Sequence, residues 1–152
     1  MKESACNPQI RELLESYQAA LGEPLVNCKG DVTSKVWNLN FPLIMHDNTI
    51  DPKFNYANKA AQNLFEYEEN EILGLPSRLS APADQQKARK VIMEKLKKDS
   101  FITNYSGTRV TKTGKLFQIV NATIWNTYNQ DRIFSGQAAL ILSFKTHSPS
   151  KN

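Results

Sequence analysis

The sequence contains few of the residues that build metal and redox sites. Among its 152 residues there are two cysteines and two histidines. Cys6 and Cys28 do not form a Cys-x-x-Cys pair and no histidine stands near them, so neither a zinc site nor a disulfide framework is expected. Two such thiols are typical of a reducing compartment, and we therefore expect a cytoplasmic protein.

Long apolar runs and a strong charge bias are also missing. No apolar segment approaches the ~20 residues that cross a bilayer, and no basic-then-apolar leader is present. The net charge is +4, and Lys and Arg alternate with Asp and Glu except in a basic run over residues 87–98. This run lacks the interleaved aromatic residues of single-strand binders, so we interpret it as a solvated helix face. We expect neither nucleic-acid nor membrane binding.

Catalytic motifs are absent as well. The sequence has no Gly-x-Ser-x-Gly, His-Glu-x-x-His or phosphate-loop pattern. His147 lies in a polar tail, and His46 stands on an expected strand just before a turn, where turn carbonyls can satisfy its ring. We predict no catalytic residue and no metal ligand.

Residues 51–79 carry the densest structural signal. Residues 54–56 alternate apolar and polar, which indicates a strand. Asn58 is suited to cap a following helix. The apolar face of that helix would consist of Ala60, Ala61, Leu64 and Phe65. A second short helix is expected at 68–73, with Gly74 able to end it in a positive-φ conformation.

An amphipathic helix is expected over residues 7–21. Its apolar positions recur at helical spacing: Ile10, Leu13, Leu14, Tyr17 and Leu21. We expect this face to cover the domain's own sheet, and the alternative is a dimer helix. Residues 34–39 continue helically, and a strand at 42–46 would form a hairpin with residues 53–56.

The second half of the sequence changes from helical to strand periodicity. Ser80 is expected to cap a long helix that ends near Lys98. The buried stripe of that helix would consist of Ala88, Val91, Ile92 and Leu96. Three strand candidates at 101–111, 116–127 and 133–144 are joined by short turns, which predicts an antiparallel meander. Two early strands, a helical middle and three late strands make an α+β domain.

Several short motifs together resemble one protein family. They are Phe54-Asn55-Tyr56-Ala57-Asn58, Gly74-Leu75-Pro76-Ser77-Arg78, Tyr105-x-Gly107-x-Arg109, Trp125-Asn126 and Gly136-Gln137-Ala138-Ala139. The pattern resembles the MEKHLA family, a PAS-like domain found alone in microbes and algae and at the C-terminus of plant homeodomain-zipper regulators. The resemblance implies a five-stranded antiparallel sheet with short helices over one face. This domain would span residues 38–146, after a helical extension at 1–37 and before a disordered tail at 147–152.

The resemblance also bears on cofactors. Flavin-binding light sensors of this fold carry a reactive cysteine after the Gly74 region, and residues 75–79 contain none. Haem-binding members use a histidine on the long middle helix, and residues 84–98 contain none. Cysteine-based flavin photochemistry and a histidine-ligated haem at this position are therefore not expected, and the cofactor is left unknown.

A PAS-like fold implies a small cavity between the short helices and the inner face of the sheet. The expected ligand-binding residues are Tyr56, Arg78, Tyr105, Arg109, Phe117, Trp125 and Gln137, with Leu64 and Leu79 as further lining residues. Either arginine can hold a carboxylate or a phosphate. The alternatives are that Arg78 locks its turn through backbone carbonyls and that Arg109 pairs with an acid such as Asp131 or Glu71.

Strand periodicity gives further expectations for this cavity. Tyr105 and Arg109 have the same parity, so their side chains share a face. Another parity set forms the expected inner face of the next strand: Phe117, Ile119, Thr123 and Trp125. The interpretation we favour for the aromatic content of that set is plain core packing. Gly136 permits close backbone approach, and the face occupied by Gln137 is left open.

We predict a sensory or binding module that recognises a small molecule or a partner protein without turnover. Its signal would pass through association, with the N-terminal helix as the interface of a homodimer or the contact with another protein. One alternative is a small NTF2-like α+β enzyme, which would need an acid or histidine in the late strands. Those strand runs contain no His, Asp or Glu. The other alternative is a structural adaptor with a filled core.

Overall fold

The computed structural model describes residues 8–82, 84 and 86–146. Its helices are α1 (Pro8–Leu21), α2 (Val32–Trp37), α3 (Lys59–Phe65), α4 (Glu69–Ile72), the short 3₁₀ helix η2 (Ser77–Ser80) and α5 (Gln86–Asp99). Its strands are β1 (Leu43–Asp47), β2 (Phe54–Ala57), β3 (Phe101–Val110), β4 (Leu116–Tyr128) and β5 (Phe134–Thr146). Asn7 and the tail at 147–152, for which a helix cap and disorder are predicted, lie outside the described residues.

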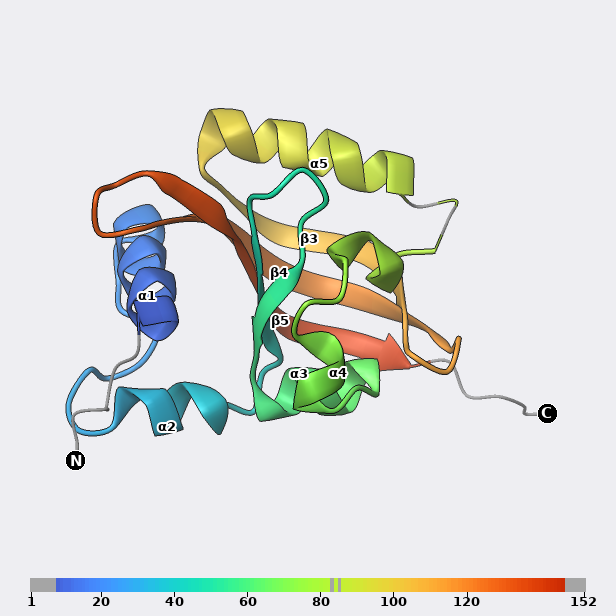
Figure 1. The fold of residues 1–152 in the computed structure, drawn as a ribbon, viewed down its shortest axis with the longest axis horizontal. Helices are drawn as coiled ribbons and strands as arrows, with labels where there is room; N and C mark the ends of the chain where they lie inside the picture. Colours follow the sequence, from blue (N-terminus) through green and yellow to red (C-terminus); the bar gives the residue numbers. More distant parts are fainter. Residues whose placement is uncertain (1–7, 83, 85, 147–152) are drawn as a thin grey trace.

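The five strands form one sheet in the order β2-β1-β5-β4-β3, and every neighbouring pair is antiparallel. The last strand in the chain, β5, lies at the centre of the sheet between β1 and β4. Figure 1 shows α1 on one side of the sheet and α3, α4 and α5 on the other. The predicted α+β class, the early hairpin and the late meander are confirmed.

The face of the sheet that α1 covers is called the outer face from here on. The apolar stripe of α1 and one side of α2 pack against β1, β4 and β5 in a continuous core. Its buried members are Ile10, Leu13, Leu14, Val32, Val36, Leu43, Met45, Trp125, Ala138 and Leu140. The prediction that the N-terminal helix covers the domain's own sheet is therefore confirmed.

The opposite, inner face is covered by α3 and α4 at one end and by η2 and α5 at the other (Figure 1). A second core fills the end under α3 and α4. Its buried members are Ile44, Phe54, Ala57, Ala61, Phe65, Ile72, Phe117, Ile119, Ala122 and Ile141. As predicted, Asn58 caps α3 and Gly74 has a positive φ of 91° shortly after α4.

Asn58 also ties three segments together from a fully buried position. Its Oδ1 accepts hydrogen bonds from the backbone N–H groups of Ala61 and Leu43, each at 3.0 Å. Its Nδ2 donates to Val36 O at 3.1 Å and to Phe41 O at 3.0 Å. One amide side chain thus satisfies the start of α3, the end of α2 and the entry to β1, which fixes their relative positions.

The prediction that Ser80 caps the long helix is wrong. Ser80 belongs to η2, where its hydroxyl donates to Ser77 O at 2.8 Å, and α5 begins at Gln86. Ala81 adopts an extended conformation, with φ −113° and ψ 138°. The reason is local, because the proline at position 82 disfavours the helical conformation in the residue before it.

The buried stripe predicted for this helix is also wrong in part. Leu96 is 1% exposed, whereas Val91 is 64% exposed and Ala88 is exposed as well. Ile92 is half-buried and lines a cavity on the inner face. The stripe expected of a helix on a filled core is therefore incomplete, since α5 covers a hollow.

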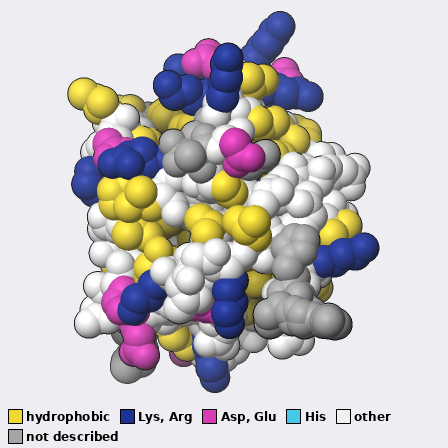
Figure 2. Space-filling model, turned by 90° about the vertical axis from the view of Figure 1, so that its right-hand side faces the viewer, with side chains coloured by type: hydrophobic (Ala, Val, Ile, Leu, Met, Phe, Trp, Pro, Cys, Tyr) yellow, Lys and Arg dark blue, Asp and Glu magenta, His cyan; other side chains and the backbone are white. Residues whose placement is uncertain are grey.

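The basic run of α5 points to solvent, as predicted from its sequence. Its exposed side chains include Lys87, Lys90, Lys95, Lys97 and Lys98. Figure 2 shows Lys and Arg side chains gathered at the end of the molecule where α5 lies.

Candidate functional site

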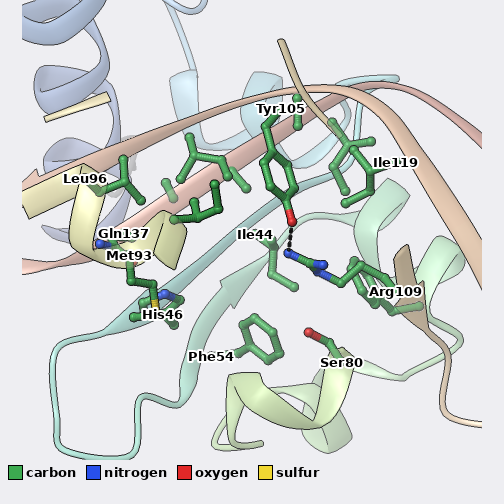
Figure 3. Close-up of a pocket in the computed structure, with 17 residues that line it drawn as sticks. Ile44, His46, Phe54, Ser80, Met93, Leu96, Tyr105, Arg109, Ile119 and Gln137 are labelled. Atoms are coloured by element: carbon green, nitrogen blue, oxygen red, sulfur yellow. Dashed lines mark hydrogen bonds between the residues drawn. The ribbon is translucent and has the colours of Figure 1, made fainter. Parts of the chain in front are cut away.

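A partly open cavity of about 80 Å³ lies between the inner face of the sheet, η2 and α5 (Figure 3). The apolar side chains around it are Ile44, Phe54, Phe65, Ile92, Met93, Leu96, Ile119, Ala122, Ile124, Ala138, Ala139 and Ile141. Its polar lining residues are His46, Ser80, Tyr105, Arg109 and Gln137. Three of the residues predicted to bind a ligand, Tyr105, Arg109 and Gln137, therefore meet here.

Tyr105 and Arg109 form the polar end of the cavity. Arg109 Nη2 donates to the Tyr105 hydroxyl at 2.9 Å, and Arg109 Nη1 donates to Thr108 O at 2.9 Å. The guanidinium carbon lies 5.5 Å from the centroid of the Tyr105 ring. The prediction that these two side chains share a face is confirmed, and Figure 3 shows their hydrogen bond beside the cavity.

The path of β3 explains how Tyr105 reaches Arg109. The register between β3 and β4 shifts on both sides of Tyr105, and Asn104 before it has a positive φ of 57°. Such irregularities re-aim side chains, and Asn tolerates this conformation better than most residues. Gly107 completes the arrangement, because an added Cβ there would lie 2.4 Å from the Tyr105 hydroxyl. The Tyr-x-Gly-x-Arg spacing thus lays the tyrosine ring over the glycine.

The charge of Arg109 is not neutralised by the acids considered from the sequence. Glu71 instead pairs with Lys112, and no hydrogen bond or ion pair joins Arg109 to Asp131 within the described part of the chain. Across the same residues, no acidic side chain lines the cavity. A guanidinium carries five N–H donors, and two of them are used by Thr108 and Tyr105. Among the described lining residues, Arg109 is therefore the one guanidinium or ammonium group, and these two hydrogen bonds leave it further donors.

Gln137 lies on the inner face, which settles the register left open by the sequence. It is 5% exposed, and its Nε2 donates to Asn126 Oδ1 at 3.1 Å. Asn126 Nδ2 in turn donates to Leu96 O at 2.8 Å, and the Asn126 N–H donates to Ser100 O at 2.9 Å. This chain of hydrogen bonds connects the cavity wall to the end of α5.

The sequence did not place His46 or Ser80 at the cavity. His46 stands directly opposite Gln137 in the β1–β5 register, and its Nδ1 lies 2.7 Å from Asp47 O. The two strands approach closely here, because an added Cβ at Gly136 would lie 1.9 Å from His46 O. The close approach predicted for Gly136 is confirmed. Only the pairing of distant strands brings His46 to the site, and no local pattern carries that information.

Other predicted site residues lie away from the cavity. Arg78, within η2, is paired with Asp51 by two hydrogen bonds of 3.1 and 3.3 Å in a half-exposed position. Phe117 is buried in the second core, outside the cavity lining, in edge contact with Phe65 and Phe144. Leu64 packs into the core under α3, and Leu79 is 44% exposed.

Tyr56 packs against the outer-face core instead of the cavity. Its hydroxyl is buried without a hydrogen-bond partner. Burial raises the pKa of the Tyr56 phenol, and the negative charge of Glu69 adds to the rise. Tyr56 is therefore a neutral, desolvated side chain at neutral pH.

The expectation that Trp125 shares the inner face with Phe117 is wrong. Trp125 is fully buried on the outer face, where its Nε1 donates to Leu13 O at 3.3 Å and its ring meets Tyr17 edge-on at 4.9 Å. The register of β4 shifts between Ile119 and Ala122, so the alternation of faces is interrupted there. Ala122 and Ile124 line the cavity, and Trp125 turns to α1.

Metal and membrane sites are not evident in the described residues. No group of three or more His, Cys, Asp or Glu side chains among them is arranged to hold a metal ion. Likewise, no helix in this part of the chain is long and apolar enough to cross a bilayer. Cys28 is exposed and free, and Cys6 lies outside the described residues.

The family model of the MEKHLA domain matches residues 8–146. The chain belongs to the MEKHLA domain family. The match extends over α1 and α2 as well as the sheet. The boundary between a helical extension at residues 1–37 and the MEKHLA domain proper at 38–146 stays a prediction. No curated protein sequence matches the chain.

Solved structures show that this MEKHLA domain has the fold of PAS domains. A PAS domain from Colwellia psychrerythraea matches with a TM-score of 0.64 and 12% identity, covering 78% of this chain and 97% of that one. A light-oxygen-voltage domain studied with a flavin analogue matches with a TM-score of 0.60 and 15% identity, covering 80% and 87%. An RNA-binding light-oxygen-voltage receptor matches with a TM-score of 0.64 and 14% identity, covering 78% and 35%.

Proposed function

We propose that this MEKHLA domain is a sensory module that binds a small molecule in the inner-face cavity and signals through association, without turnover. The observation that carries the proposal is the Arg109 guanidinium at the edge of an apolar cavity that contains no acidic partner for it among the described residues. Concave apolar sites with a few convergent polar groups are typical of ligand pockets.

The proposed ligand is smaller than a flavin. One structural neighbour is named for its flavin analogue, and that cofactor belongs to that protein. The cavity here measures about 80 Å³, whereas ligand pockets of drug-sized molecules begin at roughly 300 Å³. The segment at 75–79 also contains no cysteine. The residues present do not fit a flavin, so the proposal is restricted to small ligands.

Binding without turnover is supported by the composition of the sheet. Strands β3, β4 and β5 contain no His, Asp or Glu, so they supply no general acid or base of the kind that an NTF2-like enzyme would need. Tyr105 and Arg109 are suited to hold a group in place.

Signalling through association is supported by the contacts of β4. On the cavity side, Asn126 joins Gln137 to the end of α5. On the outer face, Trp125 donates to Leu13 O, and the N–H of Tyr128 donates to Ser16 Oγ at 3.0 Å. A change in the cavity can therefore act on α1 through one strand. The homodimer through α1 and the cytoplasmic location remain predictions within this proposal.

The experiment is native mass spectrometry on the protein purified from its own host. The wild-type chain should carry a reproducible mass increment, and the Ala122→Leu variant, which fills the cavity, should lose it. The Ala61→Leu variant enlarges a buried side chain outside the cavity and should keep the increment. A bare mass for the wild-type chain would support the structural adaptor instead. Analytical ultracentrifugation of the loaded and empty forms then tests association.

A further inference from the structure

We infer that the ligand is a short monocarboxylate, whose carboxylate binds Arg109 and Tyr105 and whose apolar tail of roughly three to five carbons runs along the sheet toward Leu96. The inference rests on the proposed function, because it names the chemical class of the molecule in the same cavity.

The volume sets the size of the ligand. A cavity of about 150 Å³ binds benzene, which corresponds to about 25 Å³ for each non-hydrogen atom. The cavity of about 80 Å³ therefore encloses about three carbons of the tail. Because the cavity is partly open, the carboxylate and the remaining carbons of an acid of about four to six carbons can lie at its edge.

The charge sets the class of the head group. Arg109 presents a planar fork of donors, and a carboxylate matches that fork with two parallel hydrogen bonds. The Tyr105 hydroxyl accepts from Arg109 and still has its own proton to donate. A carboxylate between the two would neutralise the guanidinium and receive the phenolic proton. No acidic side chain among the described lining residues competes for this position.

A phosphate group fits the same position less well. It carries about two negative charges at neutral pH and three oxygens that need partners. The lining supplies one guanidinium, and Ser80 already donates its hydroxyl proton to Ser77 O. Among the described lining residues, no second guanidinium or ammonium group is present to pair with the second charge, which is unfavourable for a partly desolvated anion.

The arrangement of the side chains sets the direction of the ligand. Figure 3 shows Arg109 and Tyr105 together at one end of the group of lining residues, and Leu96 and Met93 at the other. The floor between these ends is apolar and includes Ile44 and Ala122. A polar head at Arg109 therefore leaves the middle of the tail against these apolar side chains, and the end of the tail near Leu96 and Met93 lies beside the polar side chains of Gln137 and His46.

The inference is tested by NMR titration of the ligand-free full chain with sodium pentanoate. Pentanamide and 1-pentanol serve as neutral probes of the same size, and inorganic phosphate serves as an anion without a tail. Pentanoate should shift the backbone signals of Tyr105, Arg109 and Leu96 in a saturable manner. The three other probes should bind at least about tenfold more weakly, because a charge-assisted pair is lost or the tail is missing.

Three variants sharpen the titration. Arg109→Gln should weaken pentanoate binding about tenfold or more, and Tyr105→Phe should weaken it severalfold while leaving the ring in place. Arg78→Gln removes the same charge from η2 at a position outside the cavity lining and should leave the affinity unchanged. A dispersed NMR spectrum confirms that each variant is folded.

The outcomes separate this inference from the proposed function. Equal binding of pentanol and pentanoate, or full binding by folded Arg109→Gln, would overturn the carboxylate class and leave a ligand-binding cavity. If pentanoate does not bind but the host-purified protein carries a ligand whose mass is not that of a short carboxylic acid, the carboxylate class is overturned and the proposed function stands. No probe binding and a bare host-purified protein would overturn both.

Discussion

The two faces of the sheet are closed in different ways. On the outer face, α1 inserts a continuous apolar stripe, and Trp125 fills the space between the helix and the strands with no exposure at all. On the inner face, Leu96 is the one fully buried side chain among those described for α5, and a cavity lies beneath the helix. The side chains that line that cavity are largely apolar, and Tyr105, Arg109 and Gln137 add hydrogen-bonded polar groups.

This difference separates stability from recognition. The outer face buries its apolar area against the chain itself, and such burial is the main source of folding free energy. The inner face keeps unfilled space and unused hydrogen-bond donors, which contribute little to folding and are available to another molecule. Substitutions on the two faces should therefore separate into effects on unfolding and effects on binding.

The largest effect on unfolding is expected for Trp125→Ala. The substitution opens a large hole under α1 and removes the hydrogen bond to Leu13 O, so the free energy of unfolding should fall by about 3–5 kcal/mol. Urea unfolding followed by circular dichroism measures the change. Trp125→Phe should cost clearly less, and a loss below about 1 kcal/mol for Trp125→Ala would contradict the tight packing described for this face.

A smaller difference in stability is expected between the two variants Ala61→Leu and Ala122→Leu. Ala61 is fully buried on the core-facing side of α3 and outside the cavity lining, so Ala61→Leu should destabilise the protein by about 1–3 kcal/mol. Ala122 lines the cavity, so Ala122→Leu should change the stability by less than about 1 kcal/mol and can raise it. Thermal unfolding of the ligand-free proteins compares them, and equal losses would indicate that the cavity is not available to a side chain.

Gly107→Ala should change binding with little change in stability. Its new methyl group would meet the Tyr105 hydroxyl, which is the mobile end of a side chain, so the ring moves and the backbone stays. The hydrogen bond from Arg109 to Tyr105 is then lost, and the affinity for the ligand should fall severalfold. The melting temperature and the pentanoate titration together test this, and a large drop in melting temperature would argue against it.

The smallest effect is expected for the ion pair between Glu71 on α4 and Lys112, which lies just after β3. The pKa of Glu71 is held below its usual range, mainly because its carboxylate accepts a hydrogen bond from the backbone N–H of Glu68 and, to a smaller extent, because it accepts one from the Lys112 ammonium group. A lowered pKa in the folded state means that the ionised carboxylate stabilises the fold above its unfolded pKa of about 4.3, and that this stabilisation is lost as the pH falls through the folded value. Glu71→Gln should therefore lower the melting temperature slightly at pH 7, and the difference should vanish well below pH 4. An unchanged difference at low pH would exclude this origin.

The sequence was sufficient for most of the fold because its local signals agree with the tertiary structure. The alternation at 54–56, the Asn58 cap and the apolar stripe of α1 each act within a few residues, and each element formed where it was expected. The start of α5 was misplaced by a local effect that the sequence does contain, since the residue before a proline rarely stays helical. In the folded chain, that restriction prevails over the preference of serine for the cap position of a helix.

The site was harder to predict because it depends on irregular strands. Two register shifts aim Tyr105 at Arg109, and another turns Trp125 away from the cavity. A count of alternate residues cannot detect an extra residue in a strand. The alternation therefore predicted correctly that Tyr105 and Arg109 share a face, and it assigned Trp125 to the wrong face. His46 lies at the site because β1 pairs with β5. Arg78 lies outside the site because it pairs with Asp51. Both contacts join segments that are far apart in the chain.

The central position of β5 has a consequence for the order of events during synthesis. β1 is made early, yet its partner on one side is the last strand of the sheet. Until that strand emerges from the ribosome, β1 and β2 form an isolated hairpin, which is marginally stable in water. Pairing of two strands that are so far apart in the chain is slow. Nascent chains of this domain should therefore stay open to chaperones until translation of the meander is complete.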